Sequence, residues 1–124
     1  MKYKILLADD SSVNKDYLKS ILEKHNFEVT EASSGQEALD AIENSTPNAM
    51  ILDLMMPGIG GLDTLKMIRA KGYTFPVIIF TSDYKDETKK KCIDAGANEF
   101  LYKPTKPQHL IKLINDLFSN SSTE

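Results

Sequence analysis

Acidic side chains stand where two apolar runs of the sequence end. Residues 5–8 are followed by Asp9 and Asp10, and residues 49–52 are followed by Asp53. An apolar run that ends in a carboxylate and then turns is typical of a buried strand that delivers a reactive group to its own carboxyl end. We therefore interpret Asp53 as the centre of a site and the other two acids as its partners.

Two further apolar runs end in polar groups of other kinds. Thr81 and Ser82 follow residues 76–80, and Lys103 follows residues 99–102. If all four runs are parallel strands of one sheet, their carboxyl ends lie at the same edge. That edge would then hold three carboxylates, hydroxyl groups and one ammonium group.

This set of groups predicts a metal-assisted reaction at phosphorus. Three carboxylates within several ångströms of one another repel unless a cation compensates their charge. Oxygen ligands without a neighbouring His or Cys suit a hard cation, and Mg²⁺ is the natural candidate. Together with Lys103 and a hydroxyl group such as that of Thr81, it supplies what phosphoryl transfer to a carboxylate requires. Asp53 would then be the nucleophile.

Each of these residues also has a purely structural explanation. The pair Asp9-Asp10 can cap a following helix, and Asp53 can cap its own loop. Lys103 can be an ordinary exposed lysine, and Thr81 can belong to an ordinary helix start. Taken singly, each residue is explained at least as well in this way as by chemistry. Four strand ends that all supply groups for one reaction favour a site.

The pattern along the chain predicts the elements that bring these residues together. Strands are expected at residues 3–9, 27–32, 49–52, 76–80 and 99–102. Helices are expected at residues 13–24, 36–44, 62–70, 85–95 and 107–118. Regular alternation of strand and helix predicts a doubly wound (βα)5 α/β fold, with a five-stranded parallel sheet and helices on both faces.

The apolar content of the strands indicates their order. Residues 5–8, 49–52 and 77–80 are continuously apolar, which is typical of central strands covered on both faces. Residues 27–32 alternate between apolar and polar, and residues 99–102 form a short run, so both are expected at the edges. The order 2-1-3-4-5, taken from flavodoxin-like folds, satisfies these expectations.

Apolar spacing also predicts which helices are held firmly. The first expected helix carries apolar residues at helical spacing: Val13, Tyr17, Leu18, Ile21 and Leu22. The fourth is highly charged and has a thin apolar stripe: Cys92, Ile93 and Ala95. Little burial would hold that helix in one position. We expect one domain over residues 1–118 and a polar, frayed tail over residues 119–124.

Composition excludes several classes of protein. The chain has 124 residues, enough for a single domain with a real core. A formal net charge of -3 argues against a direct nucleic-acid clamp. The single cysteine, Cys92, cannot form an intramolecular disulfide, and no apolar stretch reaches the roughly 20 residues of a membrane span. We expect a cytoplasmic protein that does not enter membranes.

Four segments together resemble the response-regulator receiver domain of two-component signalling, which is also called CheY-like. They are residues 7–11, 51–61, 80–82 and 95–104. The resemblance covers essentially the whole chain. It implies that Asp53 accepts a phosphoryl group from a histidine kinase or a phosphotransfer protein.

The same resemblance implies roles for the surrounding residues. Asp9, Asp10, Asp53 and the backbone carbonyl of Met55 would hold Mg²⁺. Thr81 and Lys103 would bind the phosphoryl oxygens, and the Lys103–Pro104 peptide bond would be cis, which X-Pro bonds tolerate. The resemblance also suggests no catalysis beyond the protein's own phosphorylation and dephosphorylation.

A switch would carry the signal away from Asp53. Thr81 would turn toward the phosphoryl group, and Phe100 would move into the vacated space. The face formed by residues 85–95, 99–102 and 107–118 would then contact a downstream protein. Its lysines, among them Lys89, suit an acidic partner about as well as they suit a solvated helix face.

The resemblance also suggests where the phosphodonor docks. Leu18 and the pair Asn14-Lys15 would lie beside the crevice, although Leu18 is equally well explained as a core residue. The protein is expected to be a monomer, with dimerisation on activation as the alternative.

Three positions depart from the commonest family pattern. Gly60 stands where Asp or Asn is frequent, which should loosen the loop without affecting the chemistry. Met55, two residues after Asp53, cannot orient an attacking water molecule, whereas Asp83, two residues after Thr81, could. We therefore expect the phosphoryl lifetime to depend largely on access past Met55.

Other functions remain open on the sequence. The chain could be a receiver fragment of a hybrid kinase or of a larger regulator, although Met1 directly before the first strand and the short tail favour a stand-alone protein. An aspartyl-nucleophile phosphatase often has a second acid two residues after the first, where this chain has Met55. A flavin-binding protein would place phosphate against Asp9 and Asp10, which would repel it.

Overall fold

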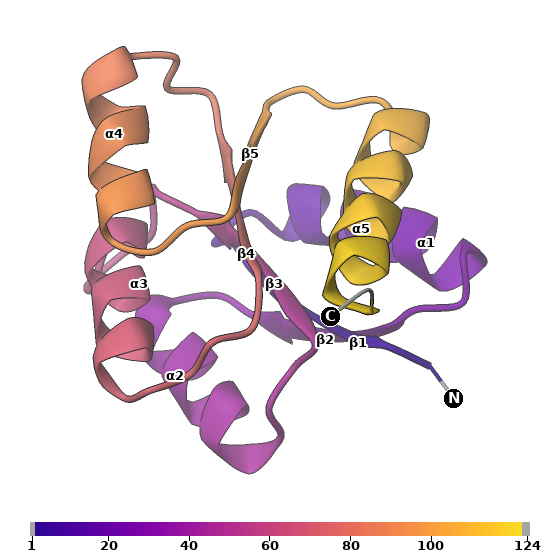
Figure 1. The fold of residues 1–124 in the computed structure, drawn as a ribbon, viewed down its shortest axis with the longest axis horizontal. Helices are drawn as coiled ribbons and strands as arrows, with labels where there is room; N and C mark the ends of the chain where they lie inside the picture. Colours follow the sequence, from indigo (N-terminus) through magenta and orange to yellow (C-terminus); the bar gives the residue numbers. More distant parts are fainter. Residues whose placement is uncertain (1, 123–124) are drawn as a thin grey trace.

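The computed structural model describes residues 2–122 as a five-stranded parallel sheet with helices on both faces (Figure 1). The strands are β1 (Lys4–Ala8), β2 (Glu28–Ala32), β3 (Ala49–Asp53), β4 (Val77–Thr81) and β5 (Glu99–Tyr102). The helices are α1 (Ser12–Lys24), α2 (Gly35–Asn44), α3 (Gly61–Ala70), α4 (Asp86–Asp94) and α5 (Pro107–Ser122). The strand order is β2-β1-β3-β4-β5, so the predicted flavodoxin-like fold is confirmed.

Burial follows the predicted division into central and edge strands. Every residue of β3 and β4 is buried, and four of the five residues of β1 are. In β2 and β5 a single residue is buried, Ala32 and Leu101 respectively. Central strands of a parallel sheet are covered by helices on both faces, whereas an edge strand is partly open to solvent.

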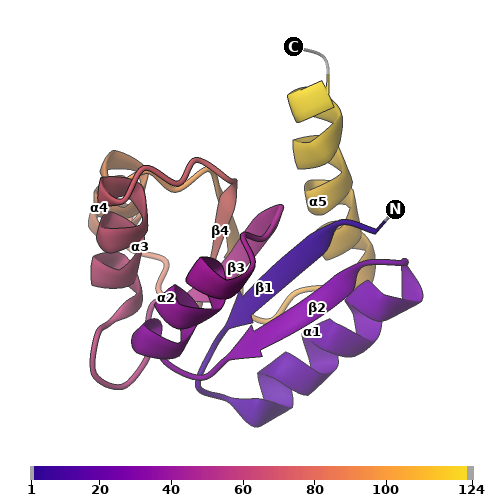
Figure 2. The ribbon, with the colours of Figure 1, turned by 90° about the horizontal axis from the view of Figure 1, so that it is seen from below.

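Two hydrophobic layers enclose the sheet. Leu6 and Ala8 pack with α2, α3 and α4, whereas the alternate residues Ile5 and Leu7 pack with α1 and α5. Successive side chains of a strand point to opposite faces, so one strand supplies both layers. Figures 1 and 2 show α1 and α5 on one side of the sheet and the other three helices on the opposite side.

Two helices bury less of their predicted apolar faces than the sequence pattern suggests. In α1, Val13 is 75% exposed and Tyr17 is 46% exposed. In α4, Ile93 is 53% exposed, and Cys92 alone among the described residues of that helix is buried. The predicted stripe of α4 is therefore thinner still, because Ile93 faces solvent.

The last helix is longer than predicted. It continues to Ser122, four residues past the expected end at Phe118, and the rest of the predicted tail, residues 123 and 124, lies outside the described residues. Apolar spacing does stop at Phe118, but no Gly or Pro follows to break the helix. Among the described residues, no helix has the length and apolar content needed to cross a bilayer.

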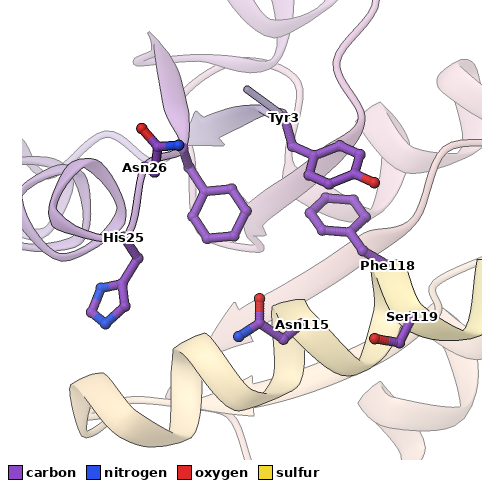
Figure 3. A pocket seen from close by; sticks show the side chains of 7 residues that line it. Tyr3, His25, Asn26, Asn115, Phe118 and Ser119 are labelled. Atoms are coloured by element: carbon purple, nitrogen blue, oxygen red, sulfur yellow. The ribbon is translucent and has the colours of Figure 1, made fainter. Parts of the chain in front are cut away.

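Aromatic rings fasten α5 to the amino-terminal edge of the sheet (Figure 3). The rings of Tyr3 and Phe118 stack with centroids 4.2 Å apart, and Phe27 lies 6.0 Å from Phe118. These rings line an open pocket of about 430 Å³ together with His25 and Asn115. The pocket lies at the opposite end of the strands from Asp53.

Candidate functional site

The carboxyl ends of β1 and β3 bring three acids together. One carboxylate oxygen of each of Asp9, Asp10 and Asp53 lies within 4.8 Å of the other two. Asp9 is 3% exposed and Asp53 is 4% exposed, whereas Asp10 is open to solvent. The cluster was predicted from the strand ends, and the parallel pairing of β1 with β3 accounts for it.

Two of these acids also fasten the loops that follow them. Asp9 Oδ1 accepts a hydrogen bond from the backbone N–H of Ser11 at 2.9 Å, and Asp53 Oδ1 accepts one from the N–H of Met55 at 3.2 Å. Asp side chains commonly bond the backbone two residues on. The structural explanation and the chemical one therefore hold together, because each carboxylate has a second oxygen directed elsewhere.

Lys103 reaches these second oxygens from beyond the end of β5. Its Nζ lies 3.4 Å from Asp9 Oδ2 and 3.5 Å from Asp53 Oδ2. The ammonium group also stands 5.1 Å from the ring centroid of Phe80. The Lys103–Pro104 peptide bond is cis, as the resemblance implied.

The charge balance of the cluster is negative despite Lys103. Burial raises the pKa of Asp53 to about 6, against the inward N–H of Met55, which lowers it. The charge of Asp9 raises the pKa further and that of Lys103 lowers it. Two buried carboxylates and an exposed one face a single ammonium group, and all the acid ligands offered are oxygens. This donor set fits a hard divalent cation such as Mg²⁺.

Thr81 lies at the carboxyl end of β4 and is 2% exposed. Its hydroxyl oxygen accepts a hydrogen bond from the backbone N–H of Asp83 at 3.1 Å. The hydroxyl can still donate its own proton to an acceptor in the crevice. The backbone carbonyl of Thr81 accepts from the N–H of Lys103 at 2.9 Å, which ties the two residues together.

Asp83 is engaged elsewhere and does not suit the water-orienting role considered for it. Its Oδ1 accepts from the backbone N–H of Lys85 at 2.9 Å, and its Oδ2 accepts from the hydroxyl of Thr88 at 2.8 Å. Both bonds hold the pKa of the Asp83 carboxyl below its ordinary value. Sequence spacing could not reveal this, because Asp side chains bond helix starts as readily as they serve in sites.

The predicted switch residue Phe100 is half-buried on β5. It packs against the hydrophobic layer that includes Cys92, and the Nζ of Lys89 lies 5.7 Å from its ring centroid. Phe100 is paired with Ile79, two residues before Thr81 on the neighbouring strand. It therefore sits between the crevice and α4, where a switch residue would have to lie.

The predicted docking residues on α1 are largely turned inward. Leu18 is 1% exposed and is a core residue, and Lys15 is 7% exposed with its ammonium group hydrogen-bonded to Ser33 Oγ. Asn14 instead points at the site, since its Nδ2 lies 3.4 Å from Asp9 Oδ2. The exposed apolar residue at this end of α1 is Val13, which the helical spacing had grouped with the core.

The loop after Asp53 depends on a close approach at Gly61. A Cβ at Gly61 would overlap the carbonyl oxygen of Asp53 and would lie 2.6 Å from Leu54 Cα. At the neighbouring Gly60 the nearest such atom, the carbonyl oxygen of Leu54, is 3.7 Å away. Gly61 therefore allows α3 to begin directly against the end of β3. Met55, in this loop, exposes 76% of its surface.

Tyr84 is a site neighbour that the sequence did not reveal. Its hydroxyl donates to the carbonyl oxygen of Lys103 at 2.7 Å, and its ring lies 4.8 Å from that of Tyr102. Finding it required knowing that the loop after β4 runs beside the loop after β5.

The strand order and the acidic cluster define a receiver-type site, and comparison with known families agrees. The model of the response regulator receiver domain matches residues 5–115. The chain belongs to this family and is a receiver domain of two-component signalling. The predicted resemblance is confirmed.

Curated relatives include proteins of several kinds. The nitrate/nitrite response regulator protein homolog of Haemophilus influenzae is 41% identical over 116 residues, covering 91% of this chain and 55% of that protein. The response regulator MprA of Mycobacterium sp. strain KMS is 32% identical over 124 residues, covering 100% and 54%. The sensory/regulatory protein RpfC of Xanthomonas campestris is 36% identical over 118 residues, covering 92% and 16%. The chain spans about half the length of the first two relatives and a smaller part of the third.

Solved structures agree with the fold. A receiver domain of the Francisella response regulator 1452 superposes with a TM-score of 0.91 at 30% identity, covering 97% of this chain and 99% of that one. A CheY-like receiver domain protein of Methanospirillum hungatei gives a TM-score of 0.93 at 27% identity, with both chains covered completely.

Proposed function

We propose that the protein is a phosphoacceptor in which Asp53 receives a phosphoryl group from a histidine kinase or a phosphotransfer protein. The observation that carries this proposal is the position of Asp53. Its Oδ2 lies 3.5 Å from the Nζ of Lys103, in a cluster with Asp9 and Asp10. A buried carboxylate with a fixed cation on one side and two further acids on the other is equipped to accept a phosphoryl group.

The transfer step follows from these positions. A carboxylate oxygen of Asp53 forms a bond to phosphorus, and the bond from phosphorus to the donor imidazole nitrogen breaks, its electron pair remaining on that nitrogen. Lys103 holds negative charge on a phosphoryl oxygen, and the hydroxyl of Thr81 donates a hydrogen bond to another. Mg²⁺ held by Asp9, Asp10, Asp53 and the backbone carbonyl of Met55 would neutralise further charge when bound.

The phosphorylated site would be read at the face formed by α4, β5 and α5. When Thr81 turns toward the phosphoryl group, the side chain of Phe100 follows it inward. Helix α4 is suited to respond because so little of it is buried. A downstream protein would recognise the altered face, with the receiver a monomer or a dimer formed on activation. A cytoplasmic location and the absence of direct contacts with nucleic acid or membrane belong to the same proposal.

The phosphodonor would approach the rim of the crevice. Val13 and Met55 are the strongly exposed apolar residues beside the acidic cluster, at 75% and 76% exposure. They replace the buried Leu18 in the contact we propose. An amphipathic donor helix could cover both while presenting its phosphohistidine to Asp53.

A second candidate is a receiver module within a larger protein, a regulator or a hybrid kinase. The lengths of the relatives favour it, since this chain covers 54% of MprA and 16% of RpfC. The chemistry at Asp53 would be the same, and only the output would differ. A phosphatase is not favoured by any contact of the site, because Met55 occupies the place of the second acid.

Incubation with acetyl phosphate and Mg²⁺, followed by intact mass measurement, tests the proposal. The wild-type protein should gain one phosphoryl group, and Asp53→Asn or a chelator should prevent the gain. Asp63→Asn is the matched control, because Asp63 is an exposed aspartate in the first turn of α3. Normal labelling of Asp53→Asn would refute the proposal. Repeated turnover of a small phosphoester would support a phosphatase instead.

A further inference from the structure

The side chain of Tyr84 joins the two loops that border the lysine side of the crevice. Its ring packs on Tyr102 with centroids 4.8 Å apart and an interplanar angle of 36°. Its hydroxyl donates a hydrogen bond of 2.7 Å to the carbonyl oxygen of Lys103. The residue is 62% exposed, so burial of its ring does not explain why it lies there. The contact with Lys103 is the specific feature.

This contact completes the support of the Lys103 backbone. The N–H of Lys103 donates to the carbonyl oxygen of Thr81 at 2.9 Å, and the carbonyl of Lys103 accepts from Tyr84. Both peptide groups that flank the Lys103 Cα are therefore held by β4 or by the loop after it. The side chain that leaves this Cα carries the ammonium group to within 3.5 Å of Asp53.

The segment that carries Tyr84 is itself fixed. The N–H of Asp83 bonds the hydroxyl oxygen of Thr81 at 3.1 Å, and the carboxylate of Asp83 bonds the N–H of Lys85 at 2.9 Å. Tyr84 lies between these two anchored residues. Its hydroxyl is thus presented from a short, braced turn, which is the condition for one group to position another.

We propose that Tyr84 is a positioning residue for phosphoryl transfer, acting through Lys103. The inference rests on the proposed function of Asp53 as the phosphoacceptor. By holding the carbonyl of Lys103, Tyr84 sets the point from which the ammonium group reaches the phosphoryl oxygen. A displaced ammonium group weakens an electrostatic interaction that matters most in the transition state, so the transfer slows without a loss of donor binding.

The test is the rate of labelling of Tyr84→Phe by acetyl phosphate in saturating Mg²⁺, measured by intact mass over a range of donor concentrations. The variant keeps the ring on Tyr102 and removes only the hydroxyl. We expect the maximal rate to fall about five-fold, as one hydrogen bond of typical strength predicts, at an unchanged half-saturating concentration of donor.

A matched control comes from the same loop. The hydroxyl of Tyr17 donates to the carbonyl oxygen of Thr105 at 3.2 Å, two residues beyond Lys103. Tyr17→Phe also removes one tyrosine hydroxyl bonded to a backbone carbonyl of this loop, but it leaves the Lys103 carbonyl untouched. We expect its labelling rate to equal that of the wild type.

A double-mutant cycle separates positioning from a general structural effect. In a Lys103→Ala background, followed over longer time courses, Tyr84→Phe should cause no further decrease, because the group it positions is gone. An equal decrease in both backgrounds, or a wild-type rate for Tyr84→Phe alone, would overturn the inference and leave the function of Asp53 standing. A wild-type protein that takes up no phosphoryl group would overturn both.

Discussion

At the scale of single residues, Asp53 combines burial with like charge. It is 4% exposed and stands beside Asp9, and these surroundings raise its pKa to about 6. The ionised form that accepts a phosphoryl group is therefore the form that the folded protein destabilises when no cation is bound. The same residue that carries the chemistry should weaken the fold.

Asp53→Asn should accordingly stabilise the metal-free protein. The folded pKa lies above the ordinary value of 3.8, so the contribution of Asp53 to stability is fully present below that value and is lost as pH rises to about 6. Above that range we expect the variant to exceed the wild type by about 2–3 kcal/mol in free energy of unfolding.

Urea unfolding in the presence of a chelator measures this difference. It should shrink as the pH is lowered toward about 4, where Asp53 is protonated in both the folded and unfolded states. Asp63→Asn, which changes an exposed aspartate, should show no such pH-dependent gain. Equal stability of Asp53→Asn and wild type near neutral pH would contradict the prediction.

Met55 should influence how long the phosphoryl group persists. Its side chain is exposed at the rim of the site and cannot orient water, while Asp83 is held by the start of α4. Met55→Asn would place an amide where water must approach, so we expect dephosphorylation to accelerate several-fold. The decay of phosphorylated protein after removal of the donor measures it.

Met67→Asn is the control for Met55→Asn, because Met67 is also exposed but lies on α3. Its decay rate should match that of the wild type. If Met55→Asn decays at the wild-type rate as well, access past Met55 does not set the lifetime.

At the scale of elements, the junction of β3 with α3 depends on the lack of a side chain at Gly61. Gly61→Ala would force a Cβ into the backbone of Asp53 and Leu54, and we expect a loss of about 2–4 kcal/mol in stability. Gly60→Asn should instead gain about 0.5–1 kcal/mol, because Gly60 is the N-cap of α3 and supplies no capping side chain.

Urea unfolding of the two variants tests this contrast between neighbouring glycines. Gly60→Asn should also leave labelling by acetyl phosphate intact, since the family pattern places Asp or Asn there. A stable Gly61→Ala protein would mean that the end of β3 can move away from α3 without cost.

Arg69 is the element-scale support of α4, which buries little of its own surface. Its guanidinium donates to the carbonyl oxygens of Gly96 and Tyr73 and to Asn98 Oδ1, at 2.9–3.1 Å. The lysine in Arg69→Lys cannot reproduce this planar fork, so we expect a loss of about 2–3 kcal/mol.

Lys71→Ala is the matched control, because the exposed ion pair of Lys71 with Glu43 should contribute at most about 0.5 kcal/mol. Urea unfolding gives both values, and amide hydrogen exchange locates the effect. Exchange should quicken in α4 and in the loop that contains Gly96 when Arg69 is replaced. Equal losses for the two variants would contradict the role of Arg69.

At the scale of the whole molecule, the sheet separates two functions. Its carboxyl edge gathers the charged groups, while its opposite edge is closed by the stacked rings of Tyr3 and Phe118 (Figure 3). The layer of α1 and α5 and the layer of α2, α3 and α4 bury separate apolar clusters. A shift of the weakly buried α4 can therefore occur without disturbing the opposite layer.

Much of this architecture could be predicted from local pattern. Continuous apolar runs identified β1, β3 and β4 as central strands, and the residue that ends each run identified the site. Such features depend on neighbours a few residues apart, and periodicity records them directly. The three acids and Lys103 met as expected because parallel strands carry their ends to one edge.

The amino-acid sequence by itself determined the elements, the order of the strands through family resemblance, and the acid at the centre. Tertiary structure decided that Tyr84 touches Lys103, that Val13 rather than Leu18 faces outward, and that Asp83 serves the start of α4. These outcomes depend on how separate loops and helices are oriented against one another. A one-dimensional pattern does not contain that orientation, because packing of the two layers against the sheet fixes it only when the whole chain has folded.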